Sequence, residues 1–116
     1  MDEPALLVLW ERIVGEVLDR TGGFPRSARF SFAARIDARA LDVLECVAAA
    51  RFSPPAQTAA LLGEADRHLA VLRVLLRVSF DRKLLDRRAL EHLSTSIDEA
   101  GRMLGGWRAW LAESAR

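Results

Sequence analysis

The chain has 116 residues, of which 51% are hydrophobic and 28% charged, so it holds enough apolar material for one core and is too short for two domains. It lacks tyrosine and is rich in alanine, leucine, arginine and glutamate, a composition that favours an all-α fold over a sandwich or barrel. The formal net charge of +1 neither indicates nor excludes a polyanionic partner until the placement of the charges is considered. We expect a single domain over residues 1–116.

The first predicted helix covers residues 4–20, where apolar residues recur at helical spacing from Leu6 to Leu18. It should stop at Gly22 and Gly23, because glycine readily adopts the left-handed conformation of a helix C-cap. Pro25 then restricts the preceding residue to an extended conformation. The chain opens with Met-Asp-Glu-Pro and a short apolar run, which fits neither a signal peptide nor a membrane span, so we expect a cytoplasmic protein.

The second predicted helix covers residues 27–52, with Ser27 as a plausible N-cap. It should end before Pro54 and Pro55, which lack the amide hydrogen that a helix interior needs. Its apolar face alternates spacings of four and three, and consists of Phe30, Ala33, Ile36, Ala40, Val43 and Val47.

The third and fourth predicted helices cover residues 56–85 and 87–111, with Asp86 as the N-cap of the fourth. The very short connection between them makes them antiparallel neighbours. Both carry a near-heptad apolar seam, and the seam of the third helix contains Leu62, Ala65, Leu69, Leu72, Leu76 and Ser79. Together the four helices predict an all-α, up-down-up-down antiparallel four-helix bundle.

The fourth helix contains an unusual stretch from Asp98 to Trp107 with three glycines. Gly101 and Gly105 are four residues apart and share one helix face, where the missing side chains would let another backbone approach closely. Alternatively, Gly105 and Gly106 simply end the helix. In the first interpretation this face, with Trp107 and the corner at Phe24 and Pro25, offers more packing surface than one small bundle needs. We therefore predict a homo-oligomer with these residues at its interface.

No arrangement of residues in the sequence indicates catalysis. The two histidines, His68 and His92, are not in the Glu-x-x-His pattern of di-iron bundles, and with Cys46 they do not complete a zinc ligand set. The chain has no glycine-rich phosphate loop and no nucleophile elbow. Cys46 falls among the apolar positions of a helix, where a buried, inert thiol is expected. We predict no enzymatic activity, no catalytic residue, no cofactor and no metal.

The basic residues are segregated into three clusters, and we predict that they form a phosphate-facing, nucleic-acid-binding surface with little base specificity. One cluster opens the second helix, another lies in the third helix, and the last brackets the turn into the fourth. An alternative for the middle cluster is an exposed ladder of weak ion pairs with Asp66 and Asp81. The eight residues are Arg26, Arg29, Arg73, Arg77, Arg82, Lys83, Arg87 and Arg88.

Three motifs together resemble one family of four-helix-bundle proteins. It includes the accessory variability determinant (Avd) of diversity-generating retroelements and the proteins encoded in intervening sequences of bacterial large-subunit ribosomal RNA genes. The retroelement protein is the closer likeness. The motifs are Phe24-Pro25-Arg26 with Arg29-Phe30, the Leu72-Arg73 and Leu76-Arg77 repeat, and Gly101-Arg102-Met103-Leu104-Gly105-Gly106-Trp107.

The resemblance implies a non-enzymatic homo-pentamer that binds nucleic acid. It also implies association with the retroelement's reverse transcriptase during mutagenic copying of template RNA into cDNA. A second possibility is a structural oligomer of the intervening-sequence type that engages only a protein partner. A neighbouring reverse-transcriptase gene with a variable repeat would favour the first possibility, whereas a location inside a ribosomal RNA gene would favour the second.

Overall fold

Four long helices form within residues 3–115, the part of the chain that the computed structural model describes. They are α1 (Glu3–Thr21), α2 (Ala34–Arg51), α3 (Pro55–Asp81) and α4 (Arg87–Ser114). A short 3-10 turn, η1 (Arg26–Ala28), and a π-helical turn, η2 (Arg29–Ala33), lie between α1 and α2.

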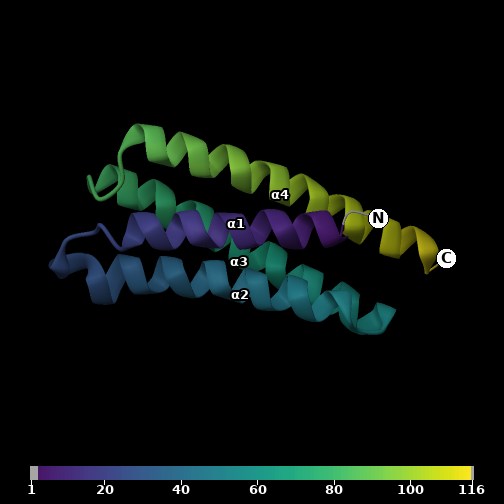
Figure 1. Ribbon diagram of the computed structural model, residues 1–116. Helices are drawn as coiled ribbons and strands as arrows, with labels where there is room; N and C mark the ends of the chain where they lie inside the picture. The colour runs from purple at the N-terminus through teal and green to yellow at the C-terminus, as the bar shows by residue number, and fades with distance from the viewer. Residues whose placement is uncertain (1–2, 116) are drawn as a thin grey trace.

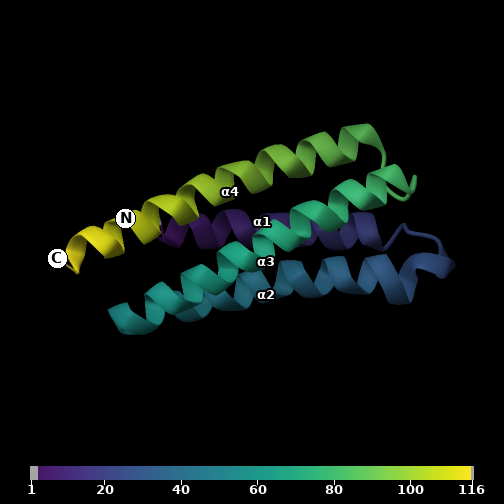
Figure 2. The ribbon, with the colours of Figure 1, turned by 180° about the vertical axis from the view of Figure 1, so that it is seen from behind.

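Each helix runs antiparallel to the one before it (Figures 1 and 2). In the bundle α1 packs against α2 and α4, and α3 also packs against α2 and α4. The bundle measures 49 × 23 × 20 Å along its principal axes, so it is one helix-length long and two helices thick. The predicted all-α four-helix bundle is therefore confirmed.

Apolar side chains from all four helices form the core. Every residue of the predicted seam of α3, from Leu62 to Ser79, is buried. Trp10 of α1 is fully buried, and its indole Nε1–H donates a hydrogen bond to the carbonyl oxygen of Ala40 in α2, at 2.9 Å. Burial of one large aliphatic side chain contributes about 1.5–3 kcal/mol, so this shared core is what holds the helices together. Its largest fully buried aliphatic members are Ile13, Ile36, Leu62, Leu72, Leu93, Ile97 and Leu104.

The corner between α1 and α2 differs from the prediction. Gly22 and Gly23 do not adopt positive φ values. Instead, their amides donate to the carbonyl oxygens of Leu18 and Arg20, at 2.9 and 3.1 Å, so the chain leaves α1 without a left-handed cap. Ser27 lies inside η1 and does not act as an N-cap, because α2 begins only at Ala34.

The prediction placed Phe30 on the apolar face of the second helix, but this is wrong. Its side chain is 86% exposed and does not belong to the core. The reason is the π-helical turn η2, in which the amide of Ala34 donates to the carbonyl oxygen of Arg29, five residues earlier. Ala28 and Ala33 are both buried and five residues apart, whereas an α-helix would bring residues three or four apart to the same face. The extra residue rotates Phe30 out of the seam and leaves Phe32 partly buried against the core.

The ends of α3 and α4 depart from prediction in two ways. Helix α3 ends at Asp81, earlier than the predicted residue 85. Helix α4 continues through Gly105 and Gly106 to Ser114, so the alternative in which these glycines end the helix is wrong. The predicted N-cap is confirmed, because the Asp86 carboxylate accepts a hydrogen bond from the amide of Ala89 at 2.7 Å. No helix within residues 3–115 has the length and hydropathy that a membrane crossing would require.

Candidate nucleic-acid interface

The up-and-down topology brings two of the three basic clusters to one end of the bundle. The α1–α2 corner and the α3–α4 turn lie together there (Figure 1). Arg77 joins these two clusters, because it is one helical turn from the C-terminus of α3. We call the cations at this end of the bundle the basic end. All its members are exposed, and none makes a salt bridge within the described residues: Arg26, Arg29, Arg77, Arg82, Lys83, Arg87 and Arg88.

The corner that carries Arg26 is anchored on both sides. Phe24 is buried, and its amide donates to the carbonyl oxygen of Thr21 at 3.0 Å. The Thr21 hydroxyl donates to the Asp37 carboxylate of α2 at 2.6 Å, which joins the end of α1 to the next helix. Pro25 is extended, with φ −61° and ψ 155°, and it starts η1. The corner therefore has a defined shape rather than that of an unanchored loop.

The side chains of Arg26 and Arg29 lie on the same side of this corner. The amide of Arg29 donates to the carbonyl oxygen of Arg26, as in a 3-10 turn, and residues three apart in such a turn are eclipsed. The π-helical turn then follows, and turns of this kind are frequent at functional sites. It leaves Phe30 exposed directly after the second guanidinium.

The turn between α3 and α4 has the hydrogen bonds of a Schellman motif. The amide of Leu84 donates to the carbonyl oxygen of Ser79, and that of Lys83 to Phe80, both at 2.9 Å. Lys83 adopts φ 63°, in the left-handed region where glycine is normally found. Leu85 is buried and secures the turn against the core. The Schellman geometry therefore holds a lysine, not a glycine, at the tip of the turn.

Arg87 follows this turn, and its guanidinium lies over the Phe80 ring, 5.2 Å from the ring centroid. A cation–π contact at an exposed site is worth about 0.5–1 kcal/mol. The contact limits the freedom of this side chain but leaves its charge unneutralised.

Arg73 differs from the other predicted phosphate contacts, because it forms an ion pair with Asp98 of α4. The predicted alternative, a ladder with Asp66 and Asp81, is wrong in its partners, since Asp66 pairs with Arg108 at 3.2 Å. Both pairs join α3 to α4, a geometry that spacing within one helix cannot reveal. Arg73 must therefore break its ion pair with Asp98 before it can contact a phosphate. Arg77 makes no salt bridge within the described residues and needs no such step.

Most of the chain matches a known protein family. A family model described as bAvd-like matches residues 8–111. The chain belongs to the bAvd-like family. The matched region contains all three motifs of the resemblance, so an accessory protein of the Avd type is supported. A search of curated proteins gave no match.

The residues predicted for an oligomer interface occupy three different environments in this bAvd-like bundle. Phe24 and Trp107 are buried within the protomer, at 8% and 4% exposure, so they have little surface left for a second copy. Gly101 lies beneath Arg73, whose Nη2 would be 3.0 Å from an added Cβ. Gly105 is exposed, with nothing within 4 Å of an added Cβ, and Pro25 is exposed at the corner. Of the residues predicted for the interface, Gly105 and Pro25 are therefore the two whose surface is open to contact with a second copy.

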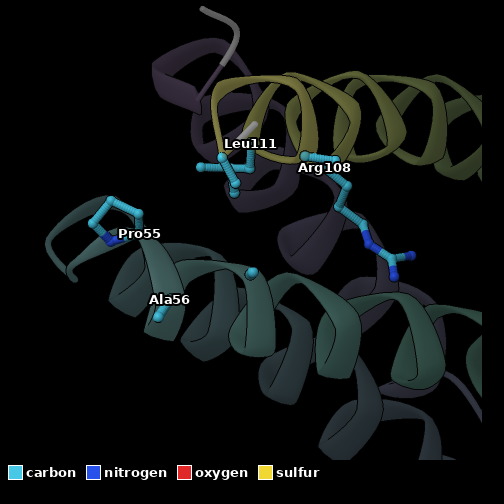
Figure 3. Close-up of a pocket in the computed structure, with 7 residues that line it drawn as sticks. Pro55, Ala56, Arg108 and Leu111 are labelled. Carbon is cyan, nitrogen blue, oxygen red and sulfur yellow. The ribbon is translucent and has the colours of Figure 1, made fainter.

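An apolar groove of about 500 Å³, which the sequence did not predict, lies at the opposite end of the bAvd-like bundle. It lies where the C-terminal end of α4 diverges from the N-terminal end of α3 (Figures 2 and 3). Its described lining has no acid, thiol or hydroxyl that could act in catalysis. The lining residues are Pro55, Ala56, Ala59, Arg108, Leu111, Ala112 and Ala115.

The two histidines and the cysteine of the bAvd-like chain have surroundings that account for them without a catalytic role. His68 receives a hydrogen bond at Nδ1 from Arg39 at 2.8 Å, and His92 lies 3.0 Å from the Glu16 carboxylate. Burial raises the pKa of the Cys46 thiol, and the nearby Glu64 carboxylate raises it further, so the neutral thiol is favoured over the nucleophilic thiolate. Within residues 3–115, acidic, histidine and cysteine side chains do not gather in threes as a metal site requires.

Proposed function

We propose that this protein is a non-enzymatic accessory factor of a diversity-generating retroelement. In this role it forms a homo-pentamer, binds RNA or DNA through its basic end and associates with the reverse transcriptase during mutagenic cDNA synthesis. The match of the bAvd-like family model over residues 8–111 carries the proposal. The reverse transcriptase, the nucleic acid and the pentamer come from the resemblance of the three motifs.

The charge distribution supports the part of the proposal that concerns nucleic acid. A net charge of +1 is small, but the exposed cations of the basic end have no acidic partner among the described residues. Between residues 77 and 88 there are five Arg or Lys residues and two Asp residues, one of which caps α4. Oligomerisation would repeat this surface in each copy and multiply the contacts with a polyanion.

The salt dependence of binding tests this proposal. Phosphate contacts release counterions, so the logarithm of the binding constant should fall with the logarithm of the salt concentration by about 0.9 per duplex phosphate neutralised. We expect Arg77→Ala to lower the slope by about one such contact per protomer, as measured by fluorescence anisotropy of a labelled duplex. Arg108→Ala is the matched control, because Arg108 is an exposed arginine at the other end and pairs with Asp66. If Arg77→Ala, Arg108→Ala and the wild type have equal salt slopes, Arg77 does not contact the phosphates of the duplex.

Association with the reverse transcriptase needs a separate measurement. Co-expression with the reverse transcriptase of the same retroelement should give a complex that survives size-exclusion chromatography at moderate salt. Absence of that complex, with both proteins folded, would contradict the accessory role.

A protein-only scaffold of the intervening-sequence type is the second candidate. The observation that favours it is the ion pair of Arg73 with Asp98, which neutralises one of the predicted phosphate contacts in a chain of almost balanced charge. This candidate predicts no retention of RNA or DNA even at low salt. A location of the gene inside a ribosomal RNA gene would support it independently.

A further inference from the structure

Phe30 is the most exposed large apolar side chain described in the protein, at 86%. It lies next to Arg29 at the basic end, and the π-helical turn keeps it out of the core. A single exposed phenylalanine is common and by itself carries no functional meaning. Its position directly after Arg29, in the corner that carries two exposed arginines of the basic end, is what requires an explanation.

The backbone at Phe30 is held in a defined conformation. Ala28 on one side and Ala33 on the other are buried, and both ends of the intervening turn are hydrogen-bonded. Arg26 and Arg29 are eclipsed on the preceding 3-10 turn. An exposed aromatic side chain thus follows two exposed cations on a segment with an anchored backbone, which limits the backbone entropy that a ligand would have to remove.

Sites for single-stranded nucleic acid combine these two features. Cations follow the phosphates, and an exposed aromatic ring stacks on an unpaired base, with little dependence on which base it is. In a duplex the bases are already stacked on each other and would leave the ring unused. We propose that Phe30 is a stacking platform for an unpaired base of RNA or DNA, with Arg26 and Arg29 contacting the adjacent phosphates. This inference rests on the proposed nucleic-acid binding and adds a preference for single strands.

The decisive experiment compares Phe30→Ala with Phe52→Ala. Phe52 is a matched control because it is 81% exposed, has the Arg51 guanidinium 5.6 Å from its ring centroid, and lies in the α2–α3 turn at the opposite end of the bundle. Binding of labelled single-stranded RNA, single-stranded DNA of the same sequence and the corresponding DNA duplex would be measured by anisotropy at low salt. Circular dichroism would verify that all variants are folded, as the exposure of both rings predicts.

We expect Phe30→Ala to weaken binding of both single strands about five- to a hundredfold, the range for loss of one base–aromatic stack. Duplex binding should be nearly unchanged, and Phe52→Ala should match the wild type throughout. The salt slope should stay the same in Phe30→Ala, because no phosphate contact is removed. An oligonucleotide with the same phosphates but abasic sugars should bind the wild type and Phe30→Ala equally.

Two further variants separate stacking from an ordinary apolar contact. Phe30→Trp keeps an aromatic face and should retain single-strand binding, whereas Phe30→Leu keeps apolar character without the face and should behave like Phe30→Ala. The Arg26→Ala, Arg29→Ala double variant should lower the single-strand salt slope by about 1.4, at about 0.7 for each phosphate.

The possible outcomes distinguish this inference from the proposed function. If the wild type binds neither single strands nor duplex at low salt, the proposed nucleic-acid function fails. If it binds nucleic acid but Phe30→Ala and Phe52→Ala bind all three ligands alike, the stacking inference is overturned and the function stands. If Phe30→Ala leaves nucleic-acid binding intact but reduces the oligomer mass or the complex with the reverse transcriptase, Phe30 is a protein contact instead.

Discussion

At the scale of single residues, Lys83 has an unfavourable backbone conformation. Its φ of 63° is the one positive value among the described non-glycine residues. The left-handed conformation costs an L-residue about 1–2 kcal/mol relative to glycine. A glycine would form the same Schellman hydrogen bonds without this cost, so a lysine here places a cation at the tip of the basic end at the expense of stability.

We expect Lys83→Gly to raise the free energy of unfolding by up to about 1 kcal/mol, because the relief of strain exceeds the added entropy of the unfolded chain. Chemical denaturation measures this directly. If Lys83 contacts a phosphate, the same variant should lower the salt slope of duplex binding by about 0.9. Lys83→Ala is the control, since it removes the charge without relieving the strain. A lower stability for the glycine variant than for the alanine variant would contradict this account.

At the scale of elements, the sequence predicts a helix well where its signals are local. The Asp86 cap, the seam of α3 and the proline stop after α2 are all confirmed. The π-helical turn η2 was not predicted, because alanines five apart carry no recognisable periodicity and Phe30 is apolar enough to extend the α-helical pattern. Ion pairs between helices were missed for a similar reason. The partner of Arg73 depends on the register of α3 against α4, which spacing within one helix does not determine.

Helix α4 carries two adjacent glycines whose environments can be compared directly. An added Cβ at Gly105 or Gly106 would meet nothing within 4 Å, so neither glycine is required by packing within the protomer. Replacing either with alanine should raise the free energy of unfolding of the protomer by about 0.5–1 kcal/mol, the usual difference in a helix interior.

Leucine variants at the same positions test the proposed oligomer interface. Gly105 shares a helix face with Gly101, and Gly106 points about a quarter-turn away. We expect Gly105→Leu to lower the mass of the assembly in sedimentation velocity, because the larger side chain blocks close approach, and Gly106→Leu to leave it unchanged. Identical masses for the two variants would show that the glycine face is not the contact.

At the scale of the whole molecule, topology accounts for the candidate site. An up-and-down bundle places its first and third connections at one end, which is why clusters more than fifty residues apart in the sequence form one basic end. The sequence indicated the clusters and the topology separately. It could not show that Arg73 is neutralised across helices, or that Trp107 and Phe24 are used by the protomer's own core.

The proposed homo-pentamer should sediment at about five times the 12.9 kDa mass of the chain, at micromolar concentration and moderate salt. The apolar surface left exposed on single protomers, including Val8 at 68% and Trp110 at 48%, is available for such an assembly. A monomer under these conditions would rule out the pentamer, and a dimer or trimer would preserve self-association with a different symmetry.

The placement of the indoles makes the protein its own fluorescent reporter. Because the chain has no tyrosine, its near-ultraviolet emission comes from three tryptophans. Trp10 and Trp107 are buried at 0% and 4% exposure, so their blue-shifted emission reports whether the core is intact. Trp110 is half-exposed and lies near the C-terminal end of α4. That end of the helix is far from the α1–α2 corner and the α3–α4 turn (Figure 1). Iodide quenching of this one indole therefore follows the burial of α4 in an assembly without interference from a ligand bound at the other end.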